Sequence, residues 1–180
     1  MKTIKDFKYK LIRNFLSKEE IELCLNYTII KHRLQDNIEL NNESLESSHY
    51  GDSLTEALLL SKRKKMEKIT GLKLLPTYSF YRMYVYDSEL LKHTDRKSCE
   101  ISVTINFGSC GTDWDIYMDG TAFNLKPGDA VVYLGVELEH WRKKFYGDYY
   151  SQCFLHYVDR DGMNTRFYKD QRLLWSEQKQ

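Results

Sequence analysis

The sequence predicts a mainly β fold, a jelly roll or closed sandwich, with helices gathered at its N-terminus. From residue 72 onward, apolar and polar side chains alternate with a period of two over roughly eight short segments, which is typical of half-buried strands. Apolar residues at helical spacing lie before that point. Fourteen tyrosines and only two prolines also favour sheet. Helices followed by many closely spaced strands are the element order expected of such a fold.

Two helices are predicted in the N-terminal part. Ser17 and Glu20 stand at the two positions of a capping box, and apolar residues follow at helical spacing, so we expect a helix over about 18–32. A second helical pattern covers about 53–70. The polar stretch 35–53 lies between them, and we interpret it as a loop that could act as a lid.

The strands are predicted from the alternating segments and from the turns between them. They cover 9–15, 77–86, 101–107, 114–118, 130–133 and 150–158. Asp119-Gly120 is a strong hairpin signal, and Pro127-Gly128-Asp129 marks a second turn. Since no repeat and no linker is visible, residues 1–180 are interpreted as one domain, with a helical part over about 1–71 and a jelly-roll core over about 72–162.

Composition argues against several functions. The 27 basic and 26 acidic side chains leave a net charge of +1, so nucleic acid and anionic membranes are not expected as main partners. The basic run 62–68 is interpreted as a solvated helix face, with a docking patch for an anionic partner as the alternative. The four cysteines are scattered, the N-terminus lacks an apolar leader, and no segment reaches the roughly 20 apolar residues of a membrane span. We therefore expect a cytoplasmic protein with reduced thiols and no membrane partner.

His93 and Asp95 carry the strongest chemical signal. If residues 93–95 form a strand, an imidazole and a carboxylate project side by side from one face. They would supply two of the three ligands of the facial triad, two histidines and one carboxylate, that holds non-haem Fe(II). His140 follows a turn and a short strand, and it is the best candidate for the third ligand. The spacing alone is a weak signal, and the β-rich surroundings strengthen it.

Five segments, taken in order, carry a resemblance to a known family. They are Leu-Leu-Pro-Thr-Tyr-Ser-Phe-Tyr-Arg-Met-Tyr (74–84), His-Thr-Asp-Arg-Lys-Ser-Cys-Glu-Ile-Ser (93–102), Leu-Lys-Pro-Gly-Asp (125–129), Glu-His-Trp-Arg (139–142) and Gln-Cys-Phe-Leu-His-Tyr-Val-Asp (152–159). Together they resemble the 2-oxoglutarate/Fe(II)-dependent oxygenase superfamily, close to its prolyl 4-hydroxylase-like members and to small phage-type oxygenases. The fold implied by this resemblance is a double-stranded β-helix (jelly roll).

The resemblance implies an enzyme with a defined set of co-substrates. His93, Asp95 and His140 fall on the family's iron ligands and are therefore both the implied metal ligands and the implied catalytic residues. Fe(II) is the implied metal, 2-oxoglutarate and O2 are the implied co-substrates, and ascorbate is a candidate additional cofactor. The implied reaction hydroxylates a substrate and converts 2-oxoglutarate to succinate and CO2. The substrate itself stays unknown, because a peptidyl prolyl group, another protein side chain or a small molecule would all fit.

The sequence departs from the family where the distal carboxylate of 2-oxoglutarate needs a cation. In prolyl hydroxylase-like proteins a basic residue lies on the last strand, about ten residues after the second histidine ligand. Here that place holds Tyr150-Ser151-Gln152. Arg142, two residues after that histidine and on the same strand face, is the favoured substitute, together with Tyr84 and a hydrogen bond from Gln152. Arg96 is the alternative, and it would serve either 2-oxoglutarate or the prime substrate.

Two rival functions are also consistent with the sequence. The missing basic residue on the last strand would fit a non-catalytic or degenerate jelly roll that binds metal or small anions. The basic run 62–68 would fit an interaction protein that binds nucleic acid or an acidic partner. The near-neutral net charge argues against nucleic-acid binding as the main function.

Overall fold

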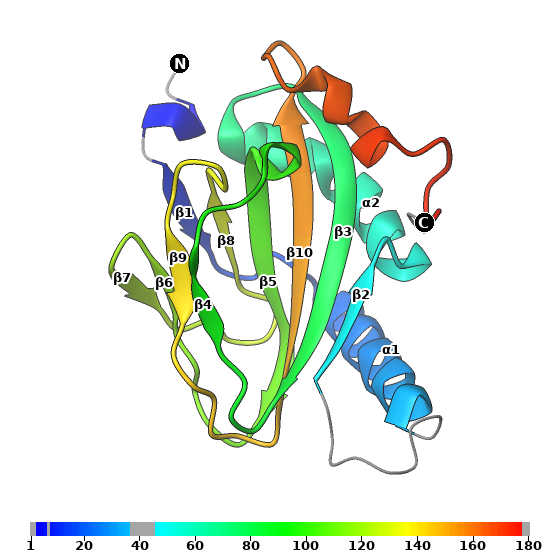
Figure 1. The fold of residues 1–180 in the computed structure, drawn as a ribbon, viewed down its shortest axis with the longest axis vertical. Helices are drawn as coiled ribbons and strands as arrows, with labels where there is room; N and C mark the ends of the chain where they lie inside the picture. The colour runs from blue at the N-terminus through cyan, green and yellow to red at the C-terminus, as the bar shows by residue number, and fades with distance from the viewer. Residues whose placement is uncertain (1–2, 7, 37–45, 178–180) are drawn as a thin grey trace.

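The computed structural model describes residues 3–6, 8–36 and 46–177, and in this part of the chain ten strands form two antiparallel sheets (Figure 1). The strands are β1 Tyr9–Ile12, β2 Ser47–Tyr50, β3 Leu74–Val85, β4 Leu90–His93, β5 Ile101–Cys110, β6 Ile116–Met118, β7 Thr121–Phe123, β8 Ala130–Tyr133, β9 His140–Arg142 and β10 Tyr149–Asp159. The larger sheet has the order β1-β8-β5-β10-β3-β2, and the smaller sheet has the order β4-β9-β6-β7. This architecture confirms the predicted mainly β jelly roll with N-terminal helices.

Two long helices, α1 (Lys18–Asp36) and α2 (Ser53–Thr70), precede most of the strands. Three short 3-10 turns complete the regular elements: η1 Ile4–Asp6, η2 Lys97–Cys99 and η3 Thr165–Gln171. The predicted capping box is present, because the Ser17 N–H donates to the Glu20 carboxylate at 2.9 Å and the Glu20 N–H donates to the Ser17 hydroxyl at 3.2 Å. α1 runs past its predicted end, since the residues that follow include no helix breaker.

Both helices cover one face of the larger sheet (Figure 1). Buried apolar residues fill this layer, among them Cys24, Leu59, Met66, Val103, Ile105, Cys153, Leu155 and Tyr157. Two buried hydrogen bonds tie the helices to β10: Thr28 Oγ1 lies 2.8 Å from Ser151 Oγ, and the Tyr157 hydroxyl donates to the Leu59 carbonyl at 2.7 Å. No helix among the described residues is long and apolar enough to cross a membrane.

The other face of the larger sheet packs against the smaller sheet. Side chains along β10 alternate between the two layers, so Gln152, Phe154 and His156 face the space between the sheets. Two buried clusters fill much of that space, one made of Ile116, Met118, Leu125, Val131, Tyr133 and Leu138, the other of Tyr84, Trp114, Phe145 and Tyr150. A cavity lined by Tyr133 of the first cluster and Tyr84 of the second lies between them.

The stretch 35–53, expected to be a loop, contains strand β2, which extends the larger sheet along β3. Packing explains the difference, because the His49 ring stacks on the buried Tyr81 ring at 4.5 Å and so overrides a polar local sequence. Residues 37–45, the middle part of the stretch 35–53 that was expected to act as a lid, lie outside the described residues.

The basic run 62–68 is only partly a solvated face. The Lys62 ammonium donates to both carboxylate oxygens of Glu20 at 2.5 and 2.7 Å, and Lys65 donates to the Phe15 carbonyl at 2.6 Å. These two lysines therefore join α2 to the start of α1. Because both lysines already bind groups within the chain, they argue against the interpretation of this run as a docking patch.

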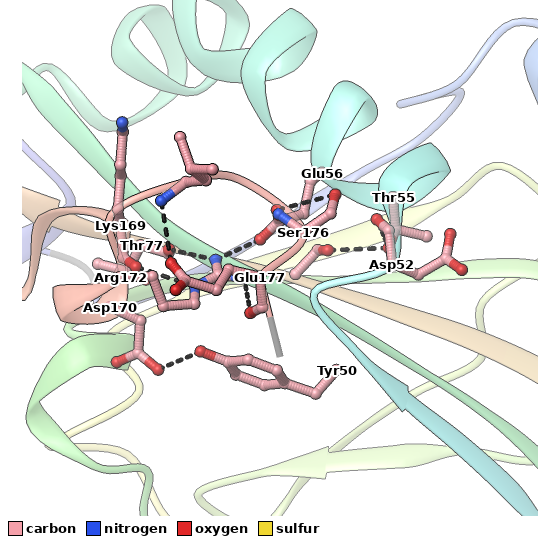
Figure 2. A network of polar contacts seen from close by, with 12 residues as sticks. Tyr50, Asp52, Thr55, Glu56, Thr77, Lys169, Asp170, Arg172, Ser176 and Glu177 are labelled. Atoms are coloured by element: carbon pink, nitrogen blue, oxygen red, sulfur yellow. Dashed lines mark hydrogen bonds and ion pairs between the residues drawn. The ribbon is translucent and has the colours of Figure 1, made fainter. Parts of the chain in front are cut away.

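The C-terminal strap, residues 160–177, folds back after β10 and ends beside α2 and β3 (Figures 1 and 2). Its anchor is an ion pair between Arg172 and Glu56, whose side chains are each only 2% exposed. Arg172 also donates to the Thr77 carbonyl of β3 at 3.3 Å, and the Ser176 N–H donates to the second carboxylate oxygen of Glu56 (Figure 2). The pair thus fastens the strap to both the helical layer and the larger sheet.

We expect Arg172→Met to lower the free energy of unfolding by about 3–5 kcal/mol, because Glu56 is then left buried in α2 without its cation. The double variant Glu56→Gln/Arg172→Met should recover part of this loss, since no charge is then stranded. Urea unfolding followed by tryptophan fluorescence measures both. Lys144→Ala, which removes an exposed pair with Asp87, is the matched control and should change stability little. An Arg172→Met variant as stable as this control would contradict the role given to the pair.

Candidate metal centre

The pairing of β4 with β9 brings His93 and His140 together. His93 is the last residue of β4, His140 is the first of β9, and the two are Cα partners in the antiparallel register. Asp95 lies beyond the end of β4, so the expected strand over 93–95 stops at His93. The Asp95 N–H instead donates to the Gly135 carbonyl at 2.8 Å. Its Oδ1 still lies 3.7 Å from His93 Nε2 and 3.5 Å from His140 Nε2.

Both histidines are held with the same nitrogen toward Asp95. His93 Nδ1 lies 2.7 Å from the Leu91 carbonyl, and His140 Nδ1 lies 3.0 Å from the Leu138 carbonyl. A carbonyl only accepts, so each Nδ1 carries the proton and each Nε2 presents a lone pair. Two lone pairs and a carboxylate oxygen, all within 4.8 Å of one another, repel unless a cation lies among them. The three side chains therefore fit a single metal ion.

The Asp95 carboxyl is tuned to stay ionised. Its burial raises its pKa, but the hydrogen bond that His140 donates when its ring is protonated, and the positive charges of His156, His140 and His93 in their protonated forms, outweigh burial and hold the pKa below its ordinary value. A carboxyl group must be deprotonated to bind a metal. Asp95 therefore meets this requirement at neutral pH.

The second carboxylate oxygen of Asp95, Oδ2, is positioned by two hydroxyl groups and by the space that Gly135 leaves. The Ser102 and Tyr133 hydroxyls donate to Oδ2 at 3.4 and 3.3 Å. A Cβ atom added at Gly135 would lie 2.5 Å from the same oxygen and closer still to the Cys99 carbonyl. Gly135 thus makes the room that Asp95 needs, and the two hydroxyls fix its rotation.

A cavity of about 210 Å³ opens beside the three donor atoms. It is lined by Tyr78, Phe80, Arg82, Tyr84, Leu90, His93, Asp95, Tyr133, His140, Phe154 and His156. Most of this wall comes from alternate residues of β3 and β10, whose inward faces carry aromatic rings. His156 lies in the wall with its Nδ1 2.8 Å from the Ser102 hydroxyl, and burial lowers its pKa to about 4, so it is neutral.

Arg142 lies buried between the sheets, on the inward face that it shares with His140. Its guanidinium lies over the rings of Trp114 and Tyr150, 4.5 and 4.7 Å from their centroids. Nη1 donates to the Trp114 carbonyl at 2.6 Å and Nη2 donates to Gln152 Oε1 at 3.0 Å. No carboxylate among the described residues pairs with this charge, although its side chain is 2% exposed.

Three buried polar atoms around Arg142 lack a hydrogen-bond partner within the described part of the chain. They are Arg142 Nε, the Tyr84 hydroxyl and the Tyr150 hydroxyl. Burial raises the pKa of both tyrosines, which the charge of Arg142 only partly offsets, so both hydroxyls stay protonated and can donate. A buried cation with unused donors around it is costly unless an anion binds there. Tyr84 also lines the cavity, so this donor cluster adjoins it.

Two further arginines lie near the cavity, and both are already paired. Arg96, the predicted alternative, is half exposed, lies 4.5 Å over the Tyr78 ring and donates to Asp170 at 2.8 Å. Arg82 lines the cavity and forms an ion pair with Glu46. Arg82 was not predicted as a site residue. Its position in the alternating pattern of β3 could have indicated it, because that pattern puts Arg82 on the inward face of the strand.

A second group of potential metal donors shares Asp95 and adds Cys99 and His156. Burial raises the pKa of the Cys99 thiol to about 12, and its sulfur lies 3.1 Å from the Tyr78 hydroxyl. A protonated thiol is a poor metal ligand. The set of His93, Asp95 and His140 is therefore the better metal site.

The sequence matches no protein-family model and no curated protein, whereas solved structures match its fold. The viral collagen prolyl hydroxylase of Paramecium Bursaria Chlorella virus-1, in its 2-oxoglutarate complex, is similar at a TM-score of 0.64 and 12% identity, over 83% of this chain and 94% of that one. A 2-oxoglutarate-Fe(II) oxygenase family oxidoreductase from Burkholderia pseudomallei gives 0.62 and 12%, over 89% of each chain. HygX from Streptomyces hygroscopicus, with nickel and 2-oxoglutarate bound, gives 0.66 and 11%, over 88% and 85%. The chain has the fold of these oxygenases, as the sequence resemblance predicts.

We expect Gly135→Ala to weaken binding of Fe(II), or of Mn(II) as an inert substitute, by about 10–100-fold, because the added methyl group displaces the Asp95 carboxylate. Isothermal titration with Mn(II) measures the effect. Gly162→Ala, at a turn of the C-terminal strap where a Cβ meets no atom closer than 3.1 Å, is the control and should bind metal normally. Equal affinity in the two variants would show that Gly135 does not position Asp95.

Proposed function

We propose that this protein is an Fe(II)- and 2-oxoglutarate-dependent dioxygenase, which hydroxylates a substrate and releases succinate and CO2. The observation that carries the proposal is the convergence of His93 Nε2, His140 Nε2 and Asp95 Oδ1 beside the cavity. Two histidines and one carboxylate would leave one side of the ion open for a chelating co-substrate and O2. The fold shared with solved 2-oxoglutarate-Fe(II) oxygenases supports the same function.

Arg142 is the proposed anchor for the distal carboxylate of 2-oxoglutarate. Arg142 and His140 share one face of β9 and are separated by about 7 Å along the strand. This separation suits a co-substrate that chelates the metal at one end and meets a cation at the other. Arg142 Nε and the hydroxyls of Tyr84 and Tyr150 would offer three unused donors to that carboxylate.

Gln152 is one of the three residues, Tyr150-Ser151-Gln152, at the place where the family carries its basic residue, and its role here is to hold Arg142. Its Oε1 accepts from Arg142 Nη2 at 3.0 Å, and its Nε2 donates to Thr104 Oγ1 at 2.5 Å. A glutamine can satisfy the guanidinium without neutralising it, so the charge stays available for an anion. In this proposal the cation has moved from the last strand to β9, and Gln152 orients it.

Bound Fe(II), with 2-oxoglutarate and O2, would supply the oxidising chemistry, and ascorbate would keep the iron ferrous. The chain's own residues prepare the site for that chemistry. The carbonyls of Leu91 and Leu138 fix the histidine tautomers, and the hydroxyls of Ser102 and Tyr133 hold Asp95. The aromatic wall of Tyr78, Phe80 and Phe154 limits the access of water to the open side of the metal site.

The volume of the cavity limits how much of the prime substrate can enter it. About 210 Å³ must hold both the co-substrate and the reacting group, so only a small part of a substrate would enter. A protein side chain, a peptidyl prolyl group included, and a small metabolite both meet this limit. A non-catalytic protein that binds metal and small anions is the second candidate function, and the absence of a basic residue on β10 favours it.

Anaerobic addition of Fe(II) and then 2-oxoglutarate should produce a visible charge-transfer band, because the keto acid would chelate the ferrous ion held by the triad. The band should need both additions and should vanish in His140→Ala. Visible absorption measures it, and circular dichroism checks that the variant is folded. A folded wild-type protein that binds Fe(II) but gives no band would contradict the co-substrate site and favour the non-catalytic function.

Arg142→Met should raise the Kd for 2-oxoglutarate by about 100-fold, because the distal carboxylate loses a buried cation. Without 2-oxoglutarate the same variant should be at least as stable to heat as the wild type, since an unpaired buried charge has been removed. Arg96→Met, which removes a half-exposed arginine whose charge is already paired with the buried Asp170, is the comparison variant and should change the Kd little. A larger effect from Arg96→Met than from Arg142→Met would reverse the assignment.

A further inference from the structure

Helix α1 carries apolar residues on two opposite faces. One face is buried: Cys24 and Thr28 point into the layer against the larger sheet. On the opposite face Leu23, Ile30 and Leu34 are 59%, 58% and 56% exposed. They recur at i, i+7 and i+11, so they line up as one stripe along the helix. Single exposed apolar residues are ordinary, but three aligned on one helix are typical of an interface.

Exposed acidic residues of α1 lie near its N-terminal end, where Lys18 is also exposed, and an exposed basic residue lies near its C-terminal end. Glu19 and Glu22 lie exposed near the N-terminal end, and Arg33 lies exposed near the C-terminal end. A second copy of α1 packed parallel would set like charges against each other. A second copy packed antiparallel would set the acidic end of each helix against the basic end of the other. The surface is therefore complementary to itself in one orientation.

The spacing of the stripe fits the same orientation. A two-fold axis between Asn26 and Tyr27 would bring Leu23 of one copy opposite Ile30 of the other, and would do so twice. Leu34 would lie at each end of this contact, beside Glu19 of the second copy. The same axis would set Glu22 near Arg33 of the second copy, because both residues lie on the same side of the stripe. Asn26, exposed at the centre, would meet its own counterpart, and an amide can both donate and accept.

We propose that two copies of this chain associate through α1, packed antiparallel about a two-fold axis between Asn26 and Tyr27. The inference is independent of the proposed enzymatic function. α1 covers the face of the larger sheet that lies away from the smaller sheet, so this dimer would leave the cavity of each copy accessible (Figure 1). A contact through one helix from each copy buries less than the roughly 1,200 Å² of a stable complex, so the dimer is weak and reversible.

Sedimentation equilibrium over a range of protein concentrations, up to about 1 mM, tests the proposal. The average mass should rise from 21.5 kDa toward twice that value. Leu23→Glu/Ile30→Glu should stay monomeric at every concentration, with unchanged circular dichroism because both side chains lie outside the core. Leu173→Glu, at an apolar residue of the C-terminal strap that is 82% exposed, is the control and should behave as the wild type.

Charge reversal tests the antiparallel orientation itself. Glu22→Lys alone and Arg33→Glu alone should each weaken the dimer, because each sets like charges together at both ends. An equal mixture of the two variants should restore association, since every opposed pair is then of opposite sign. A wild-type protein that is monomeric throughout, a dimer that survives Leu23→Glu/Ile30→Glu, or a mixture that stays as weak as its components would overturn the proposal.

Discussion

The antiparallel pairing of β4 with β9 places His93 directly opposite His140, and the other groups of the candidate site take their positions from that pair. Asp95 reaches the two imidazoles because the chain leaves β4 after His93 and bonds to the Gly135 carbonyl. Arg142 faces the same interior because it follows His140 by two residues on β9. The larger sheet supplies the facing wall, and α1 and α2 fix that wall from behind.

The interior between the sheets contains two groups whose charge is not balanced by a neighbour, and the two are of opposite sign. Two imidazole lone pairs and a carboxylate form an electron-rich group at one place, and a guanidinium with no carboxylate partner among the described residues lies at another. Each arrangement costs free energy in the unliganded protein. A metal ion would relieve the first, and an anion would relieve the second. A keto acid with a distal carboxylate could chelate that metal ion at one end and reach the guanidinium at the other, so one molecule would connect the two places.

Local signals in the sequence predicted much of the fold. The capping box at Ser17, the period-two alternation and the Asp119-Gly120 turn all report interactions between near neighbours. Strand β2 and the C-terminal strap were not predicted, because each depends on distant partners. β2 forms along β3 despite its polar sequence, and the strap is held by Arg172 against Glu56.

The candidate site also contains residues that the sequence predicts and residues whose role depends on the fold. The inward face of Arg142 could be proposed from spacing, since a strand fixes which side chains share a face. Asp95 was proposed from the same argument, but it reaches the two histidines from beyond the end of β4. Gly135 could not be identified, because its importance lies in a contact with Asp95 that only the fold creates. The role of Gln152 in holding Arg142 could not be identified either, since Tyr150-Ser151-Gln152 shows only that a basic residue is missing there, and the contact with the guanidinium exists only in the fold.

Conversion of 2-oxoglutarate to succinate tests the proposed chemistry most directly. Protein loaded with Fe(II) and a limiting amount of 2-oxoglutarate is exposed to O2 for hours, and succinate is measured by mass spectrometry. An oxygenase should form succinate in an O2-dependent way, and Asp95→Ala should form none. Protein that holds both Fe(II) and 2-oxoglutarate in O2 but leaves the keto acid intact would contradict the enzymatic function and identify a binding protein.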